Sequence, residues 1–144
     1  MTRAAIWRAA ALCLAASAGP VLAQAKAAAL APAQAIAAAA AAPGGSVDAA
    51  IEMDVGSAGA TGYTVFLNSA KNYRDPANLS VELHSGAKAA LRTQLGGEPE
   101  DVLVGKHVRV TGTVRRVAVP RRDGTSYFQT RIDVDRIEQI TVSG

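Results

Sequence analysis

The chain has 144 residues, with 15 lysines and arginines against 12 aspartates and glutamates and a formal net charge of +3. This length allows one small domain, and the small net charge excludes a polycation that binds nucleic acid or a membrane with its whole surface. Cys13 is the one cysteine, which excludes a fold that depends on internal disulfides.

The first 23 residues have the layout of a secretory signal peptide. Two arginines precede an apolar run over 9–16, and small residues follow up to Ala23, where we expect cleavage. The run is too short to span a bilayer, and Leu12 before Cys13 lacks the small side chain that a lipoprotein cleavage site needs. The sequence therefore predicts a periplasmic or secreted protein without a membrane span, whose net charge after cleavage is +1 (13 − 12).

Residues 24–46 are predicted to form a disordered, alanine- and proline-rich linker. Of these 23 residues 13 are alanine, Pro32 and Pro43 interrupt them, and two glycines end them. Alanine favours helix, but a short segment broken by proline and without an amphipathic face is marginal in water. We expect a tether with transient helix. Lys26 and Pro32 oppose the alternative of a second membrane span.

Residues 47–144 are predicted to form one domain of five half-buried strands and one helix. The strands follow from an alternation of apolar and polar residues over 51–55, 63–68, 79–84, 107–115 and 127–135. The helix lies between the third and fourth strands, over 86–95. Ser85 can cap this helix, Ala87 and Leu91 share its apolar face, and Gly96 is placed to end it.

Turn residues join these segments. Residues 57–62 connect the first two strands, Asp75 and Pro76 favour a type I turn, and Asp123 with Gly124 predicts the tip of a hairpin. Gly112 inside a strand predicts the bend or bulge that a small closed barrel needs. The glycines before residue 63 are spaced like a phosphate-binding loop, but a strand follows them instead of a helix, which favours a flexible hairpin.

Three strands, a helix and two strands are the order of the oligonucleotide/oligosaccharide-binding (OB) fold, an all-β, five-stranded Greek-key barrel with a helix at one end. YTVFLNSAKNYRDPANLSV (63–81), VGKHVRVTGTV (104–114) and IEQI (137–140) resemble a family of small exported bacterial domains of this fold. That family's pattern is aromatic-Leu-Asn, a tyrosine-containing polar loop, Gly-Lys-x-Val-x-Val-x-Gly and a late Gln-Ile. The resemblance covers about 61–140 and implies the architecture. Nucleic-acid binding is assigned to that family by its fold.

The resemblance stops at one hairpin. RRVAVPRRDGTSY (115–127) is longer and more basic than the short turn that the family has there, so no hairpin contacts are carried over.

The second predicted strand and the loop after it hold candidate ligand contacts. With Val65 inward, Phe66 and Asn68 point to the outer face, where this fold stacks bases or sugars. The loop adds Lys71, Tyr73 and Arg74. Alternatively, Asn68, Asn72 and Asp75 bond to the backbone of their own turn, and the linker or a loop covers Phe66.

A basic segment over 105–131 is the second candidate surface, with seven basic residues and one acidic residue. The candidate contacts have outward strand parity or lie beside the hairpin tip: Arg109, Arg115, Arg121, Arg122, Tyr127 and Arg131. Guanidinium groups around a tyrosine suit phosphate contact with stacking. Charges on an edge hairpin also prevent strands of different molecules from pairing, so both interpretations stay open.

No motif predicts catalysis, a cofactor or a metal site. His84 and His107 lie on different strands without a neighbouring pair of ligands, and no serine stands near a plausible base. The sequence therefore predicts a non-catalytic exported module that binds single-stranded nucleic acid or another polyanion. The alternative is a structural domain of the cell envelope that docks a protein or a glycan.

Overall fold

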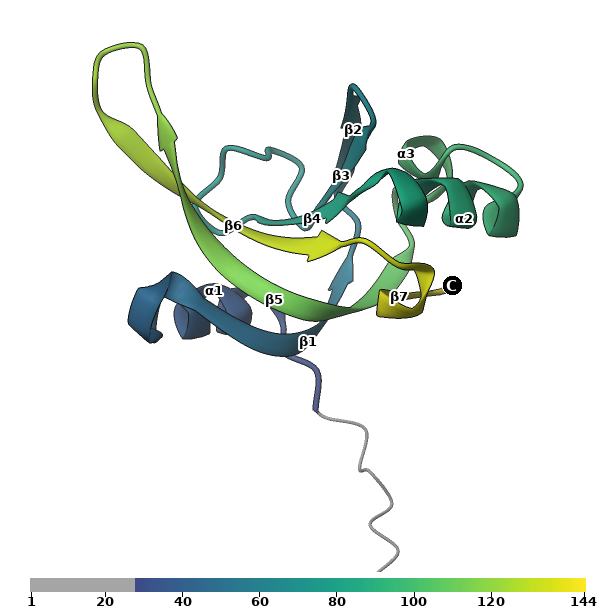
Figure 1. Ribbon diagram of the computed structural model, residues 1–144, viewed down its shortest axis with the longest axis horizontal. Coiled ribbons are helices and arrows are strands. Elements are labelled where there is room, and N and C mark those ends of the chain that lie inside the picture. The colour runs from purple at the N-terminus through teal and green to yellow at the C-terminus, as the bar shows by residue number, and fades with distance from the viewer. Residues whose placement is uncertain (1–27) are drawn as a thin grey trace, which may run out of the picture.

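The computed structural model describes residues 28–144 (Figure 1). The predicted signal peptide and the first residues of the predicted linker lie outside the described residues. Over 28–144 the chain is mostly β, with one mixed sheet and a few short helices.

The strands are β1 (Ser46–Asp54), β2 (Ser57–Thr61), β3 (Thr64–Asn68), β4 (Leu79–Leu83), β5 (His107–Pro120), β6 (Ser126–Val134) and β7 (Ile140–Ser143). The helices are α1 (Pro32–Ala41), α2 (Ser85–Leu95) and α3 (Pro99–Val102), with 3-10 turns η1 (Pro43–Gly45) and η2 (Ile137–Gln139). The sheet order is β1-β5-β6-β4-β3-β2, and β7 pairs with β5. β4 and β6 are parallel, and the other pairs are antiparallel.

All five predicted strands are present, but the structure adds two. β2 consists of residues that were predicted to be a turn, and β7 follows η2. The turn after β2 is the dipeptide Gly62-Tyr63, which joins the paired residues Thr61 and Thr64. Gly62 has φ +59°, the positive value that the first central position of a type II′ hairpin requires.

The sheet is not closed into the predicted barrel. β1 and β2 are consecutive in the chain but stand at opposite ends of the strand order, because β2 pairs with β3 instead of β1. Three backbone hydrogen bonds hold the junction between them. Val55 donates to the carbonyl of Lys106 (2.9 Å) and accepts from the N–H of Gly105 (2.8 Å), and the N–H of Gly56 donates to the carbonyl of Asn68 (2.8 Å).

The interior is built from the inward side chains of the strands, as the alternation predicted. Val65, Val110 and Ile132 are all fully buried in one hydrophobic cluster, and burying each such side chain contributes about 1.5–3 kcal/mol. Ala87 and Leu91 of α2 join this cluster. The residue that caps α2 is His84 instead of the predicted Ser85, and Gly96 ends the helix in the left-handed region, as predicted.

The prediction of a disordered linker is wrong for the described part of the alanine-rich segment. Leu30 forms backbone hydrogen bonds with Ala50 (2.8 Å) and Glu52 (2.9 Å) of β1, and α1 packs against β1, β4 and β5 (Figure 1). Ala35 and Ala39 of α1 are fully buried. Small side chains let this helix approach the sheet closely, so burial supplies the stability that an isolated alanine helix lacks.

β5 changes partner along its length, from β1 (over 107–115) to β6 (over 114–120). The strand is continuous and curved (Figure 1), and its register with β1 and β6 has no bulge, which leaves the bend of the predicted bend or bulge. A Cβ at Gly112 would lie 3.2 Å from the carbonyl oxygen of Asp133 and 3.1 Å from Nε2 of Gln139. That Nε2 donates to the carbonyls of Thr111 (3.0 Å) and Asp133 (3.1 Å). The missing side chain of Gly112 therefore makes room for the bridging Gln139.

Two hairpins extend away from the core, the long hairpin (residues 115–131 of β5 and β6) and the short hairpin (residues 57–68 of β2 and β3) (Figure 1). The long hairpin passes beyond the core, so Phe128, predicted to face inward with Ile132, is 50% exposed. The guanidinium of Arg116 covers it, 3.4 Å from the ring centroid. The loop over 69–78 lies between the two hairpins.

Candidate nucleic-acid interface

A groove of about 630 Å³ lies between the long and the short hairpin. β2, β3, the loop over 69–78, β4, β5 and β6 all contribute to its lining. Six residues predicted from the sequence line it: Phe66, Asn68, Lys71, Tyr73, Tyr127 and Arg131.

A second hollow of about 410 Å³ adjoins the groove and shares Tyr127 with it. Arg74, Arg121 and Arg122 line this hollow, so the structure brings nine of the eleven predicted residues to two neighbouring depressions. Arg109 and Arg115 lie elsewhere. The role of the nine residues in binding stays a prediction.

Each aromatic ring of the groove has a guanidinium beside it. The Cζ atom of Arg131 lies 5.9 Å from the centroid of Phe66, that of Arg121 lies 5.0 Å from Tyr127, and that of Arg74 lies 5.2 Å from Tyr73. Distances of this size are typical of cation–π contacts. Three rings and three guanidinium groups are therefore paired in and beside the groove, an arrangement that suits a ligand with both planar groups and negative charges.

A chain of hydrogen bonds runs along the outward side of β6 and fixes the groove floor. Nε2 of Gln129 donates to the hydroxyl of Tyr127 (3.1 Å), and Oε1 of Gln129 accepts from Nε (3.1 Å) and Nη2 (2.7 Å) of Arg131. The remaining Nη1 of Arg131 donates to Oε1 of Glu82 (2.8 Å). Arg131 is therefore held in one orientation, and its charge is balanced by a carboxylate.

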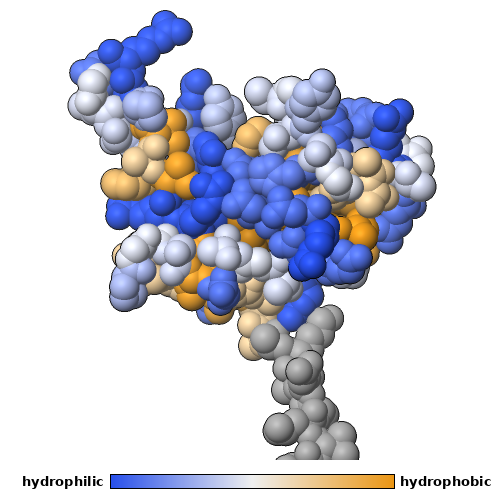
Figure 2. Space-filling model, in the orientation of Figure 1, coloured by the Kyte–Doolittle hydropathy of each residue, from blue (hydrophilic) through white to orange (hydrophobic). Residues whose placement is uncertain are grey.

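The chain continues into an ion-pair network beneath the long hairpin. Nη2 of Arg115 donates to Oε2 of Glu82 (2.9 Å), and the same guanidinium binds both carboxylate oxygens of Asp133 (2.6 and 3.0 Å). The two arginines and the two carboxylates of the network sum to zero charge. Figure 2 shows the result as a hydrophilic band over β6 and β4, with hydrophobic residues on both sides. The outer face that the sequence predicted to be basic is thus electrically neutral where Arg115 and Arg131 meet Glu82 and Asp133.

The pKa values of the two carboxyl groups move in opposite directions. Burial raises the pKa of Glu82, whose side chain is 7% exposed. The hydrogen bond from Arg115 lowers the pKa of Asp133 well below its ordinary range. Asp133 therefore stays ionised as the counterion of Arg115 at any ordinary pH.

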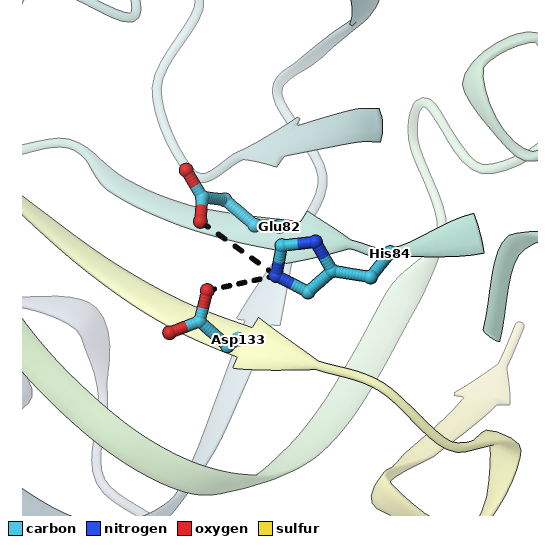
Figure 3. Close-up of side chains that lie close together, drawn as sticks. All are labelled: Glu82, His84 and Asp133. Atoms are coloured by element: carbon cyan, nitrogen blue, oxygen red, sulfur yellow. Dashed lines mark hydrogen bonds and ion pairs between the residues drawn. The ribbon is translucent and has the colours of Figure 1, made fainter. Parts of the chain in front are cut away.

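Glu82, His84 and Asp133 bring three possible metal ligands together (Figure 3). Nε2 of His84 lies 2.9 Å from Oδ1 of Asp133 and 3.9 Å from Oε2 of Glu82. Nη2 of Arg115 donates to these same two carboxylate oxygens. A guanidinium thus already serves as their cation, and the geometry fits a network that ties β4, β5 and β6 together better than it fits a metal site.

Arg109, one of the predicted contacts, lies on the side of β5 that faces β1. Its Nη1 donates to Oε1 of Glu52 (2.9 Å). It lines a separate shallow depression with Thr111 and Glu138, away from the aromatic residues. The predicted arginines of β5, β6 and the turn between them therefore form two sets. Arg109, Arg115 and Arg131 are paired with carboxylates, and Arg121 and Arg122 have no acidic partner within 28–144.

Some residues of the loop over 69–78 form the hydrogen bonds of its turns, and others present their side chains at the surface. Asn72 accepts a bond from the N–H of Arg74 (3.0 Å), Asp75 accepts one from the N–H of Ala77 (2.9 Å), and Asn78 accepts one from the N–H of Ala70 (3.0 Å). Asn72 and Asp75 hold the turn, as the alternative interpretation expects. Asn78, which it did not include, does so too, whereas Asn68 bonds to side chains.

Lys71, Tyr73 and Arg74 are exposed, and so are the turn residues 72 and 75–77. Asn68 lines the groove with Phe66, as its strand parity predicted, but it is only 6% exposed, and its Oδ1 accepts a bond from Oγ of Ser80 (2.7 Å).

Sequence reasoning missed β2, Gln129 and Glu82. β2 is made of Ser, Ala, Gly and Thr, so it shows no alternation of apolar and polar residues. Gln129 has the same outward parity as Tyr127 and Arg131 and could have been found from it. Glu82 could not, because its partners Arg115 and Arg131 are far from it in the sequence.

No protein-family model matches the chain, and no curated protein sequence matches it. Among solved structures, an aspartyl tRNA synthetase from Entamoeba histolytica aligns at 15% identity with a TM-score of 0.38. The alignment covers 67% of this chain and 18% of the synthetase, so this chain spans less than a fifth of that protein. A likeness at this level establishes neither family nor function. None of the helices over 28–144 has the length and hydropathy needed to cross a bilayer.

Proposed function

We propose that the protein is a non-catalytic binding module of OB type, exported from the cytoplasm, that holds a single-stranded nucleic acid in the groove between its hairpins. Another extended polyanion is the alternative ligand. One observation carries the proposal: Phe66, Tyr73 and Tyr127 share a groove with Lys71, and Arg121 and Arg122 border it. The order of strands and the helix between β4 and β5 support the OB assignment.

The distribution of charge supports a ligand with separate rings and charges. Five cations line the groove and the adjoining hollow, and four of them have no acidic partner within 28–144: Lys71, Arg74, Arg121 and Arg122. The groove floor is neutral, since Arg131 is balanced by Glu82. Phosphates would meet the cations at the rim, and bases would stack on the rings, a contact that contributes about 1–3 kcal/mol per base.

Fluorescence anisotropy with a labelled oligothymidylate, titrated at several salt concentrations, tests the proposal. Four phosphate-neutralising cations predict a slope of about −3 in a plot of log K against log salt, because about 0.7 counterions leave a single strand per contact. Absence of binding at low salt, or binding that does not weaken with salt, would contradict it.

A second candidate function, docking of a partner protein at the cell envelope, is favoured by the edge of β2, which has β3 as its one strand neighbour among residues 28–144. Export itself is a proposal that stands on the layout of residues 1–23. N-terminal sequencing of the protein recovered from periplasm and medium tests it, and a chain that keeps its first 23 residues would contradict it.

A further inference from the structure

The groove meets β2 along its edge. All five residues of β2 line the groove. Successive side chains of a strand point to opposite faces, so a surface that touches five consecutive residues must approach the backbone from the side. Within 28–144, β2 stands at the end of the strand order and has β3 as its one strand neighbour.

The register shows which backbone groups face the groove. The two-residue turn makes Thr61 and Thr64 a hydrogen-bonded pair, and such pairs alternate with non-bonded pairs along an antiparallel ladder. Gly59 is then bonded to β3, and the N–H and C=O groups of Ala58 and Ala60 point away from it. β2 thus presents two donors and two acceptors at the spacing of a strand.

β2 also lacks the features that normally protect an edge. Soluble proteins place lysine, proline or inward charges on exposed edge strands to prevent pairing. Residues 57–61 contain neither a charge nor a proline. The tip of the long hairpin, in contrast, carries Pro120, Arg121 and Arg122. One hairpin edge beside the groove is therefore protected by charge and proline. The other has neither protection, although α3 packs against β2 and β3.

The charges of the groove restrict what can pair with β2. Lys71 and Arg131 are the charged residues of its lining, and no lining residue is acidic. Arg74, Arg121 and Arg122 extend the positive charge into the adjoining hollow. Arg131 is balanced by Glu82, so the cations that an added strand would meet are Lys71 and the arginines of the hollow.

We propose that β2 accepts an extended polypeptide segment with acidic side chains as an additional strand of the sheet. The backbone of Ala58 and Ala60 supplies the hydrogen bonds, and Lys71 with the neighbouring arginines selects the acidic side chains. This gives the groove a second class of ligand, beyond the nucleic acid of the proposed function.

The probe is an eight-residue peptide of alternating Asp and Thr with blocked ends, titrated into the ¹⁵N-labelled protein and followed by NMR. We expect the amides of Ala58 and Ala60 to shift and to become protected from hydrogen exchange. The same peptide N-methylated at its four central residues keeps its charges but cannot form the strand bonds, so it should bind at least tenfold more weakly. A Lys-Thr peptide should not bind.

Ala60→Pro removes one outward N–H, and Ala60→Ser is the matched control that keeps it. An edge N–H that is not bonded to β3 tolerates proline, so both variants should unfold within a few degrees of the parent protein. We expect Ala60→Pro to weaken the Asp-Thr peptide about tenfold and Ala60→Ser to leave it unchanged. Equal binding of the N-methylated peptide, no binding of the parent peptide, or shifts that avoid β2 would overturn the inference.

An oligothymidylate added to the peptide complex separates this inference from the proposed function. We expect the two ligands to exclude each other, because both need the same groove. Binding of the oligonucleotide without the peptide overturns the β2 inference alone. Binding of the peptide without the oligonucleotide overturns the nucleic-acid proposal alone.

Discussion

The base and the tip of the long hairpin both contain arginines, but Arg115 and Arg131 at the base are paired with carboxylates and, within 28–144, those at the tip are not. At the base, Arg115 and Arg131 lie against Glu82 and Asp133, which balance their charge and fix their positions. At the tip, Arg121 contacts Thr125 and Tyr127, and neither Arg121 nor Arg122 is paired with a carboxylate within 28–144. The base therefore serves stability and the tip is available to a ligand. A basic run in a sequence indicates a binding surface only where its counterions lie elsewhere.

The largest effect that separates the two regions should come from Glu82→Gln. Removing a buried carboxylate leaves Arg131 and Arg115 without their shared counterion, and we expect the free energy of unfolding to fall by about 3 kcal/mol. Glu52→Gln, which breaks the more exposed pair with Arg109, is the matched control and should cost less than about 1 kcal/mol. Urea unfolding of both variants measures the difference. Equal losses of unfolding free energy in the two variants would mean that the ion pairs at the base stabilise the fold no more than an exposed pair does.

The double variant Arg121→Gln/Arg122→Gln should affect binding and not stability. Loss of two of four phosphate contacts should halve the salt slope, from about −3 to about −1.5, while the free energy of unfolding in urea stays within about 0.5 kcal/mol of that of the parent protein. Arg109→Gln is the control and should leave both the slope and the affinity unchanged. An unchanged slope in the double variant would show that the tip does not bind the phosphates.

The acid sensitivity of the base should depend on Asp133. Its pKa is lower in the folded protein than in the unfolded chain, so its contribution to stability is present above its ordinary pKa of 3.8 and is lost as the pH falls below that value. The pKa of Glu82 is higher in the folded protein than in the unfolded chain, so protonation of Glu82 favours the folded state as the pH falls.

Between pH 5 and pH 3 the free energy of unfolding should fall in the parent protein. In Asp133→Asn we expect this fall to be about 1 kcal/mol smaller. Unfolding free energies at the two pH values test this. Parallel losses in both proteins would mean that Asp133 is not the acid-sensitive partner of Arg115.

The smallest effect should come from Tyr127→Phe. This change removes the hydroxyl that accepts from Gln129 and keeps the ring, so the affinity for oligothymidylate should change less than about threefold. Tyr127→Ala removes the ring and should weaken binding by about tenfold or more. Anisotropy titrations of the pair separate stacking from hydrogen bonding, and a similar loss in both variants would argue against stacking.

Local patterns predicted most of the fold, and long-range pairing decided the rest. The alternation around Val65, Val110 and Ile132 located strands and core correctly. The closed barrel was predicted wrongly because closure depends on which edge strands pair with each other. The turn at Gly62-Tyr63 makes β2 pair with β3. α1 was missed because its stability comes from burying Ala35 and Ala39 against the sheet, which no property of the segment alone reveals.

In the candidate site, too, local patterns predicted some positions, and contacts between residues remote in the sequence decided the others. Strand parity correctly placed Phe66, Tyr127 and Arg131 on one side of the sheet, and they share the groove. Parity could not show that Arg115 and Arg131 are balanced by Glu82, because that carboxylate comes from a strand remote in the sequence. Nor could it show the open edge of β2.

The most direct test of the central claim is an NMR titration of the ¹⁵N-labelled protein with oligothymidylate, which maps the ligand onto the two groups of arginines. The account predicts that the shifts concentrate at Phe66, Tyr73, Tyr127 and the hairpin tip and leave the region of β1 and β7 around Arg109 unchanged. Shifts centred on Arg109, or none at all at saturating oligonucleotide in low salt, would contradict it.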